Sequence, residues 1–150
     1  MKTLLKTVIL FLGAVVLTGC SYTKPYPNMP KKNLTVHTNM KSKKPMTGVD
    51  VNLHIWEYKS EKDNEYLGTV ELEDSPIMKV GIPEGHWVEF IVEIVKPGGQ
   101  IKEKHFIRPR SGLTYQVDIE YNDKYYIVEI YETDISRNRT RKISKGDLKD

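Results

Sequence analysis

Cysteine, phenylalanine and helical periodicity are all scarce in this chain of 150 residues. It has one cysteine, Cys20, and three phenylalanines. A single cysteine excludes a disulfide bond within the chain, so packing alone must stabilise the folded domain. Beyond residue 20, no stretch of ten or more residues carries apolar side chains at helical spacing. This absence argues against an all-α or α/β fold.

Sequence motifs of catalytic and metal sites are missing too. His37, His54, His86 and His105 show no H-x-H or H-E-x-x-H spacing, and no serine lies in a G-x-S-x-G motif. A lone histidine on a strand is ordinarily a solvated or hydrogen-bonded side chain, and a metal or catalytic role is the less favoured alternative. We therefore expect no metal, no cofactor and no enzymatic activity.

The first nineteen residues have the layout of a secretory signal. Lys2 and Lys6 form its positively charged start. The uncharged stretch from Val8 to Leu17 has about ten residues, too few to cross a bilayer core of about 30 Å as a helix. We therefore assign residues 1–19 to a cleaved signal peptide and exclude them from the folded core.

The apolar stretch ends with Leu17-Thr18-Gly19-Cys20, which resembles the lipobox of bacterial lipoproteins. The resemblance implies that the thiol of Cys20 receives a diacylglyceryl group, that a peptidase cuts before this residue, and that the new amino terminus is acylated. Two or three acyl chains anchor a protein stably to a membrane, whereas one chain binds only marginally. A signal anchor, or a soluble export signal with an incidental cysteine, is the alternative.

Ser21 bears on where such an anchor would place the protein. In lipoproteins of the enterobacterial type, an aspartate after the lipidated cysteine favours retention in the inner membrane, and this chain has serine there. For a Gram-negative host, the resemblance therefore implies a lipid anchor in the outer membrane with the domain facing the periplasm.

Proline and charge divide the remainder into three parts. Residues 20–32 contain three prolines, which favours an extended spacer that holds the domain off the bilayer. Residues 33–134 form the folded domain, and residues 45–134 have nine basic and eighteen acidic residues, 9 − 18 = −9. Residues 135–150 form a basic tail with 6 − 2 = +4. We expect the basic ends to be solvated, with attraction to anionic lipid as the alternative.

Net charge also bears on nucleic acid binding. The formal charge of +3 includes two leader lysines, and their removal leaves 21 − 20 = +1. Proteins that bind nucleic acid carry a strongly basic patch or stripe, so we expect no nucleic acid partner.

Alternation of apolar and polar residues predicts strands through most of the domain. The predicted segments are 33–38, 49–58, 65–73, 77–83, 86–95, 101–108, 114–121 and 124–132. Asn122-Asp123 is expected to join the last two as an antiparallel hairpin, and the polar segment 101–108 suits a sheet edge. Seven to eight short strands predict an all-β fold, an antiparallel β-sandwich of immunoglobulin-like or transthyretin-like type rather than a barrel.

The runs NEYLGTVEL, VGIPEGHW and IRPRSGLTYQVDIEYNDKYYIVEIYE, in this order, resemble a type of small uncharacterised proteobacterial lipoprotein. The resemblance covers residues 33–134 and implies a lipoprotein with a β-sandwich domain, but no activity. The lipoprotein of the type VI secretion system, with its transthyretin-like sandwich, is similar in architecture, size and anchor.

Aromatic residues at outward strand positions are the strongest indication of a binding role. Trp56, Tyr58, Trp87, Tyr125 and Tyr131 lie opposite the apolar faces of their strands. Aromatic side chains are favoured at protein interfaces, although they also cover the outside of ordinary sandwiches.

Two function hypotheses follow from these aromatic residues. The first is a lipid-anchored, non-enzymatic envelope module, with an accessory or structural role, that binds a protein partner. The alternative is a periplasmic domain that binds a small ligand or cell-wall polymer in a concave cluster of the same aromatic side chains.

Overall fold

The computed structural model describes residues 26–27, 29–41, 49–72, 76–122 and 125–143. The predicted signal peptide, Cys20, most of the predicted spacer and the end of the basic tail lie outside the described residues. The described residues form nine strands: β1 (Leu34–Lys41), β2 (Asp50–Ser60), β3 (Asp63–Glu71), β4 (Ile77–Val80), β5 (Trp87–Lys96), β6 (Gly99–Ile107), β7 (Leu113–Asn122), β8 (Tyr126–Asp134) and β9 (Arg139–Lys142). A search of the same residues finds no helix long and apolar enough to span a membrane.

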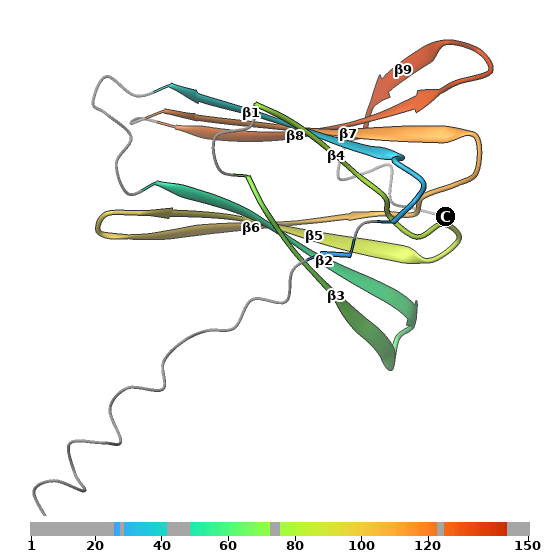
Figure 1. The fold of residues 1–150 in the computed structure, drawn as a ribbon, viewed down its shortest axis with the longest axis horizontal. Coiled ribbons are helices and arrows are strands. Elements are labelled where there is room, and N and C mark those ends of the chain that lie inside the picture. Colours follow the sequence, from blue (N-terminus) through green and yellow to red (C-terminus); the bar gives the residue numbers. More distant parts are fainter. Residues whose placement is uncertain (1–25, 28, 42–48, 73–75, 123–124, 144–150) are drawn as a thin grey trace, which may run out of the picture.

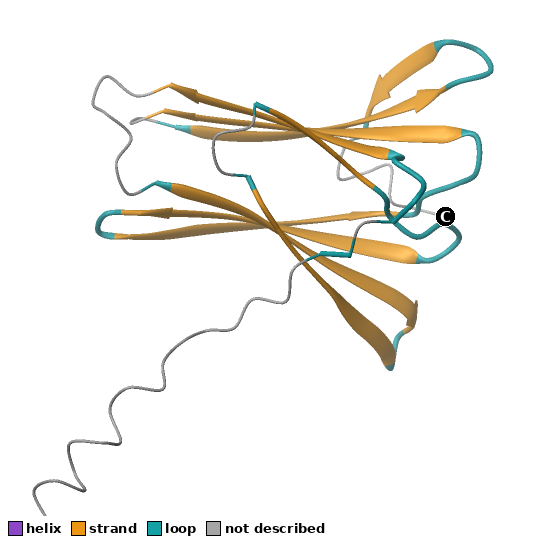
Figure 2. Ribbon diagram, in the orientation of Figure 1, coloured by secondary structure: helices purple, strands orange, loops and turns teal. Residues whose placement is uncertain are grey.

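The strands form two sheets that stack face to face (Figure 1). Sheet I has the order β4-β1-β7-β8-β9, and sheet II has the order β3-β2-β5-β6. All regular structure in the described residues is strand (Figure 2). The predicted β-sandwich is therefore confirmed. Pairing continues past the predicted domain end at residue 134, because β9 pairs with β8 within the segment interpreted as a tail.

The first strand is placed in the sheet that does not contain the second. In an immunoglobulin constant-type sandwich the first two strands are neighbours in one sheet. Here β1 and β2 lie in different sheets, and β1 pairs in parallel with β7 along its whole length. The order therefore differs from the constant-type immunoglobulin order at the first strand.

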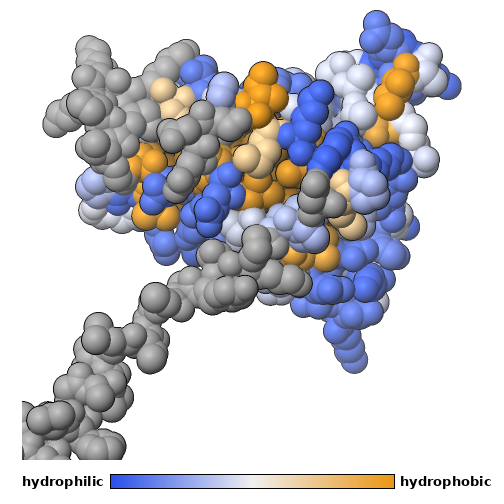
Figure 3. Space-filling view, viewed as in Figure 1, coloured by the Kyte–Doolittle hydropathy of each residue, from blue (hydrophilic) through white to orange (hydrophobic). Residues whose placement is uncertain are grey.

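The core fills the space between the inner faces of the two sheets. Leu53 and Ile55 of β2, Phe90 of β5 and Val117 of β7 are completely buried. Full burial of such a side chain contributes roughly 1.5–3 kcal/mol. Figure 3 shows apolar residues along this middle layer and mostly hydrophilic residues around β3. Burial alternates in β2 and β7 as predicted, and the edge position of β6 is confirmed. In β5 the predicted apolar residues face the core, but Glu89 and Glu93 at outward positions are buried as well.

The end of the predicted spacer is bound to the sandwich. The backbone N–H of Tyr26 donates to the carbonyl of Thr69 at 3.0 Å, and its hydroxyl donates to the carbonyl of Gly81 at 2.5 Å. The buried Asn33 side chain exchanges two hydrogen bonds with the backbone of Ile82, at 2.8 and 3.0 Å. Burial, together with the nearby charge of Glu57, raises the pKa of Tyr26 to about 12.

Candidate functional site

Three of the five aromatic residues that the sequence predicts to form an interaction surface lie together on the outer face of sheet II. Trp56 and Tyr58 lie on β2, and Trp87 lies on β5 directly across from Tyr58. All three side chains are partly exposed. Alternation along the two strands places them there, because their neighbours in sequence, including Val88, face the core.

Two further aromatic residues extend this group. Tyr66 of β3 lies with its ring centroid 4.9 Å from that of Trp56, and Phe106 of β6 lies 6.0 Å from Tyr58 in an edge-to-face arrangement. A register shift in the β2–β3 pair aligns Tyr66 with Trp56, and Phe106 belongs to a largely polar strand, so sequence alternation did not single them out. We call the set Trp56, Tyr58, Tyr66, Trp87 and Phe106 the aromatic face.

Tyr125 and Tyr131 are not part of the aromatic face. Tyr131 lies on β8 of sheet I, and Tyr125 directly precedes that strand. The hydroxyl of Tyr125 donates to Glu120 at 2.9 Å, and that of Tyr131 donates to Glu129 at 2.5 Å. These hydrogen bonds raise the pKa of both tyrosines. The structure therefore divides the predicted interaction surface between the two sheets.

Two glutamates lie buried beneath the aromatic face, both on the central strand β5. Glu89 is 3% exposed; it accepts a hydrogen bond from the Tyr58 hydroxyl at 2.8 Å and pairs with Lys104 at 3.2 Å. Glu93 pairs with His54 and Lys102, each at 2.9 Å. A buried carboxylate is costly unless it is paired, and here each has two partners. These contacts hold the aromatic and basic side chains of the outer face in place.

The same contacts shift the pKa values of this face. Hydrogen bonding to Glu89 raises the pKa of the Tyr58 hydroxyl. Burial acts to raise the pKa of Glu93, but the hydrogen bonds from Lys102 and His54 outweigh it and hold the pKa below its usual value. Glu93 therefore stabilises the fold in its ionised form.

Glu93→Gln is expected to lower the free energy of unfolding at about pH 7, with the difference shrinking towards about pH 3. The folded-state pKa of Glu93 lies below its unfolded value near 4.5. The ionised group therefore stabilises fully above that value, and this contribution is lost as pH falls through the folded-state pKa. Urea unfolding at the two pH values measures the difference.

Glu65→Gln is the matched control for this prediction. Glu65 pairs with Lys59 at 3.3 Å, and both side chains are well exposed. Exposed pairs contribute little, so the control should change stability by less than about 1 kcal/mol at either pH. A loss in the Glu93 variant that is equally large at both pH values would contradict the assignment.

The four histidines lie in four separate places, and each contacts one carboxylate. The pairs are His37–Asp118, His54–Glu93, His86–Glu57 and His105–Glu103. Within the described ranges, no group of three histidine, cysteine or acidic side chains lies close enough to hold a metal ion.

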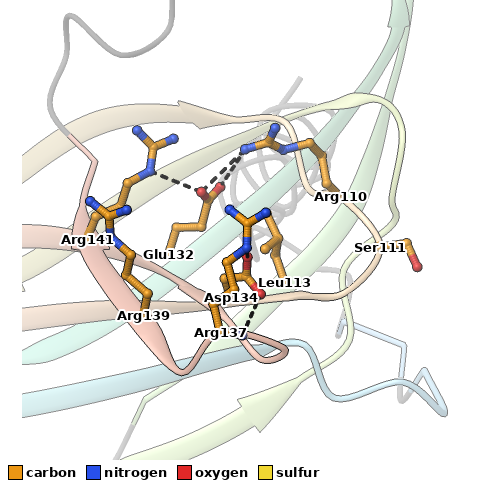
Figure 4. A pocket seen from close by; sticks show the side chains of 8 residues that line it. All are labelled: Arg110, Ser111, Leu113, Glu132, Asp134, Arg137, Arg139 and Arg141. Carbon is orange, nitrogen blue, oxygen red and sulfur yellow. Dashed lines mark hydrogen bonds and ion pairs between the residues drawn. The ribbon is translucent and has the colours of Figure 1, made fainter.

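A second candidate site is a pocket of about 500 Å³ at one end of sheet I (Figure 4). Its lining is mainly charged and consists of Arg110, Ser111, Leu113, Glu132, Asp134, Arg137, Arg139 and Arg141. The chain segment between β6 and β7 supplies two of these residues, and the others come from β7, β8, β9 and the turn before β9. We call this site the arginine pocket. Sequence analysis missed it because the last three arginines were interpreted as a solvated tail.

Glu132 is the centre of the arginine pocket. Its side chain is 11% exposed and contacts Arg110 Nη2 at 3.4 Å and Arg141 Nε at 3.1 Å. The buried Tyr115 hydroxyl donates to the same carboxylate at 3.2 Å from below. The charge of Glu132 raises the pKa of Arg110 further, so this guanidinium stays charged. The carboxylate thus orients two guanidinium groups that come from opposite sides of the pocket.

Asp134 organises the turn that closes the pocket. Its carboxylate accepts hydrogen bonds from the backbone N–H and hydroxyl of Ser136, at 2.9 and 2.6 Å, and from the backbone N–H of Arg137 at 3.2 Å. The Ser136 hydroxyl contributes most to lowering the pKa of Asp134. Arg139 lies across from Asp134 on β9, yet its side chain makes no hydrogen bond or ion pair with the part of the chain that the structure describes.

No protein-family model matches this chain, and no curated protein is similar to it. The two sites are therefore interpreted from their own geometry.

Proposed function

We propose that this protein is a lipid-anchored, non-enzymatic envelope module that binds a protein partner through the aromatic face. The observation that carries the proposal is the direct cross-strand pair of Tyr58 and Trp87, with Trp56 on the same outer face. Such residues dominate the binding energy of protein interfaces, particularly when they are clustered and held in place. The buried contacts of Glu89 and Glu93 supply that support here.

A protein partner suits this geometry better than a small ligand. A ligand site was expected to gather the tryptophans and tyrosines into a concave cluster, but Tyr125 and Tyr131 belong to the other sheet. The arginine pocket contains no aromatic side chain in its lining. Lys102 and Lys104 border the aromatic face and are at least half exposed, which resembles the polar rim of an interface. We therefore expect a folded partner with a flat, apolar-centred surface.

Trp87→Ala is expected to weaken partner capture by about ten-fold or more, because truncation of a central interface aromatic commonly costs about 2 kcal/mol. The measurement is site-specific photo-crosslinking in intact envelopes, with the crosslinking residue at position 56 and the alanine substitution in the same chain. Partner yield is compared with that of the chain carrying Trp87.

Tyr131→Ala is the matched control, because Tyr131 lies on sheet I and its hydroxyl donates to a neighbour on the same strand, Glu129. It should leave crosslinking from position 56 unchanged. Two results would count against the aromatic face as the binding surface. One is a partner yield from a crosslinking residue at position 131 that equals the yield from position 56, and the other is a folded Trp87→Ala variant whose partner yield equals that of the chain carrying Trp87.

A further inference from the structure

We propose that the arginine pocket binds a phosphate group, carried either by a soluble phosphate ester or by a lipid headgroup. This inference rests on a different part of the molecule from the aromatic face and does not depend on the proposed function. The pocket offers three things that phosphate recognition needs: an excess of positive charge, free guanidinium donors, and a rigid support for those donors.

The charge excess follows from the lining. Four arginines and two acids line the pocket, so its formal charge is 4 − 2 = +2. Both acids are already engaged: Glu132 with Arg110 and Arg141, and Asp134 with the β8–β9 turn. A phosphate monoester carries about −1.5 to −2 charges at neutral pH, which matches this excess.

The guanidinium groups of Arg137, Arg139 and Arg141 keep N–H donors that have no partner among the described residues. Arg141 contacts Glu132 through Nε, which leaves both of its Nη groups without a partner among the described residues. Within the same ranges, the guanidinium N–H groups of Arg139 make no hydrogen bond. The Nε of Arg137 lies 3.8 Å from the Asp134 carboxylate. Figure 4 shows these guanidinium groups arranged around the Glu132 carboxylate. A guanidinium has five N–H donors in a planar fork that fits phosphate oxygens.

The support for these donors is strand pairing. Tyr115, Glu132 and Arg141 are aligned across β7, β8 and β9. Two residues further towards the turn, a second row consists of Leu113, Asp134 and Arg139. Side chains two residues apart on a strand share a face, so both rows point to the same side of sheet I. Since Tyr115 and Glu132 are buried on that side, the arginines of β9 extend the inner face of the sheet. Sites built on strands hold their geometry better than sites on loops.

A purely structural explanation leaves Arg139 without a role. Ion pairs from Arg141 to Glu132 and from Lys142 to Glu129 suffice to attach β9 to β8. The side chain of Arg139 adds positive charge beside three other arginines and makes no hydrogen bond or ion pair within the described residues. Repulsion between like charges makes this arrangement unfavourable until an anion is bound. Arg139 is therefore the residue that best separates ligand binding from strand attachment.

The test uses the full chain in a neutral detergent micelle, labelled with ¹⁵N so that arginine Nε–H signals are observed. In one arm the probe is inorganic phosphate. In the other arm the probes are phosphatidic acid and phosphatidylcholine, each mixed into the micelles. We expect saturable shifts of the Arg139 and Arg141 signals with phosphate or phosphatidic acid and none with phosphatidylcholine. If the arginine signals shift with inorganic phosphate and not with phosphatidic acid, the ligand is a soluble phosphate ester. If they shift with phosphatidic acid and added inorganic phosphate reverses that shift, the ligand is a lipid headgroup.

Arg139→Gln is expected to weaken phosphate binding by about ten-fold, as loss of a charge-assisted hydrogen bond does. Because the Arg139 side chain makes no hydrogen bond or ion pair with the described residues, the thermal midpoint of this variant should stay unchanged. Arg137→Gln provides a second variant and should weaken binding by several-fold. Arg108→Gln is the matched control: it removes the same charge from an exposed arginine that does not line the pocket and contacts the Gly85 carbonyl.

Three results would overturn the proposal. The first is the absence of saturable shifts with every probe at about 0.05 M salt, where charge screening is weak. The second is an equal loss of binding in Arg108→Gln and Arg139→Gln, which would indicate general attraction to a basic chain. The third is a phosphatidic acid response that persists in Arg139→Gln and is not reversed by inorganic phosphate.

Discussion

Replacing Gly81 by alanine is expected to displace residues 26–33 from the sandwich and to lower the free energy of unfolding by about 3 kcal/mol. A Cβ atom at this position would lie 2.0 Å from the carbonyl oxygen of Lys31 and 2.7 Å from the Cβ of Met29. The nearest atom belongs to the backbone, so no change of rotamer relieves the clash. The segment before β1 must therefore move.

Movement of this segment would break contacts on both sides of Gly81. The hydroxyl of Tyr26 donates to the Gly81 carbonyl itself, and Asn33 exchanges its two hydrogen bonds with the next residue, Ile82. Lys31 also pairs with Glu84. Loss of a partner for the buried Asn33 amide costs about 1–3 kcal/mol, which is why the expected effect exceeds that of an ordinary surface substitution.

Two measurements check the Gly81 prediction: denaturant unfolding, and hydrogen exchange at the Tyr26 amide, which is bonded to the Thr69 carbonyl. Gly98→Ala is the control, because Gly98 has φ +89° and open space around it. Its backbone strain should cost about 1 kcal/mol and leave exchange at Tyr26 unchanged. If Gly81→Ala keeps full protection at Tyr26, the segment is not held by this contact.

Local patterning was enough to predict most strands but not how they are ordered. The alternation in β2, β5 and β7 marks one face of each strand for the core, and Asn122-Asp123 marks the hairpin. The parallel pairing of β1 with β7 joins Leu34 to Tyr115. These residues are so far apart in sequence that no local sequence pattern predicts their pairing. β9 escaped prediction because its sequence RTRK has no apolar alternation. Its backbone pairs with β8, and the ion pair from Arg141 to Glu132 supports that pairing.

The residues of the aromatic face could be predicted from the sequence more readily than those of the arginine pocket. Trp56, Tyr58 and Trp87 could be placed on outward faces from alternation alone, and antiparallel pairing of β2 with β5 brings them together. The arginine pocket needs the β6–β7 connection, which carries Arg110, to meet β8 and β9. A site assembled from such distant segments requires the sheet order, which alternation does not encode.

Cys20→Ser is expected to move the protein from the membrane fraction to the soluble fraction and to abolish incorporation of labelled palmitate. A serine hydroxyl lacks the nucleophilicity of the thiolate that the proposed lipid transfer requires. Each buried methylene contributes about 0.8 kcal/mol to membrane binding, so loss of two or three acyl chains removes the proposed anchor entirely. Ser21→Ala is the control and should keep both the label and the membrane fraction.

Palmitate on the Cys20→Ser chain would show that another residue is acylated. A Cys20→Ser chain that is unlabelled but still sediments with membranes would show that the anchor is not the lipid.

The proposed anchor at Cys20 would also limit how far the domain reaches from the bilayer. Because Tyr26 is bound to Thr69 and Gly81, only residues 21–25 separate the proposed anchor from the sandwich. Five residues span at most about 20 Å whatever their conformation. Gly81→Ala should lengthen this tether to residues 21–32, at most about 40 Å. If the partner lies close to the membrane, crosslinking from position 56 should then fall in Gly81→Ala without any change to the aromatic face. Equal crosslinking at both tether lengths would mean that the bound segment does not position the domain.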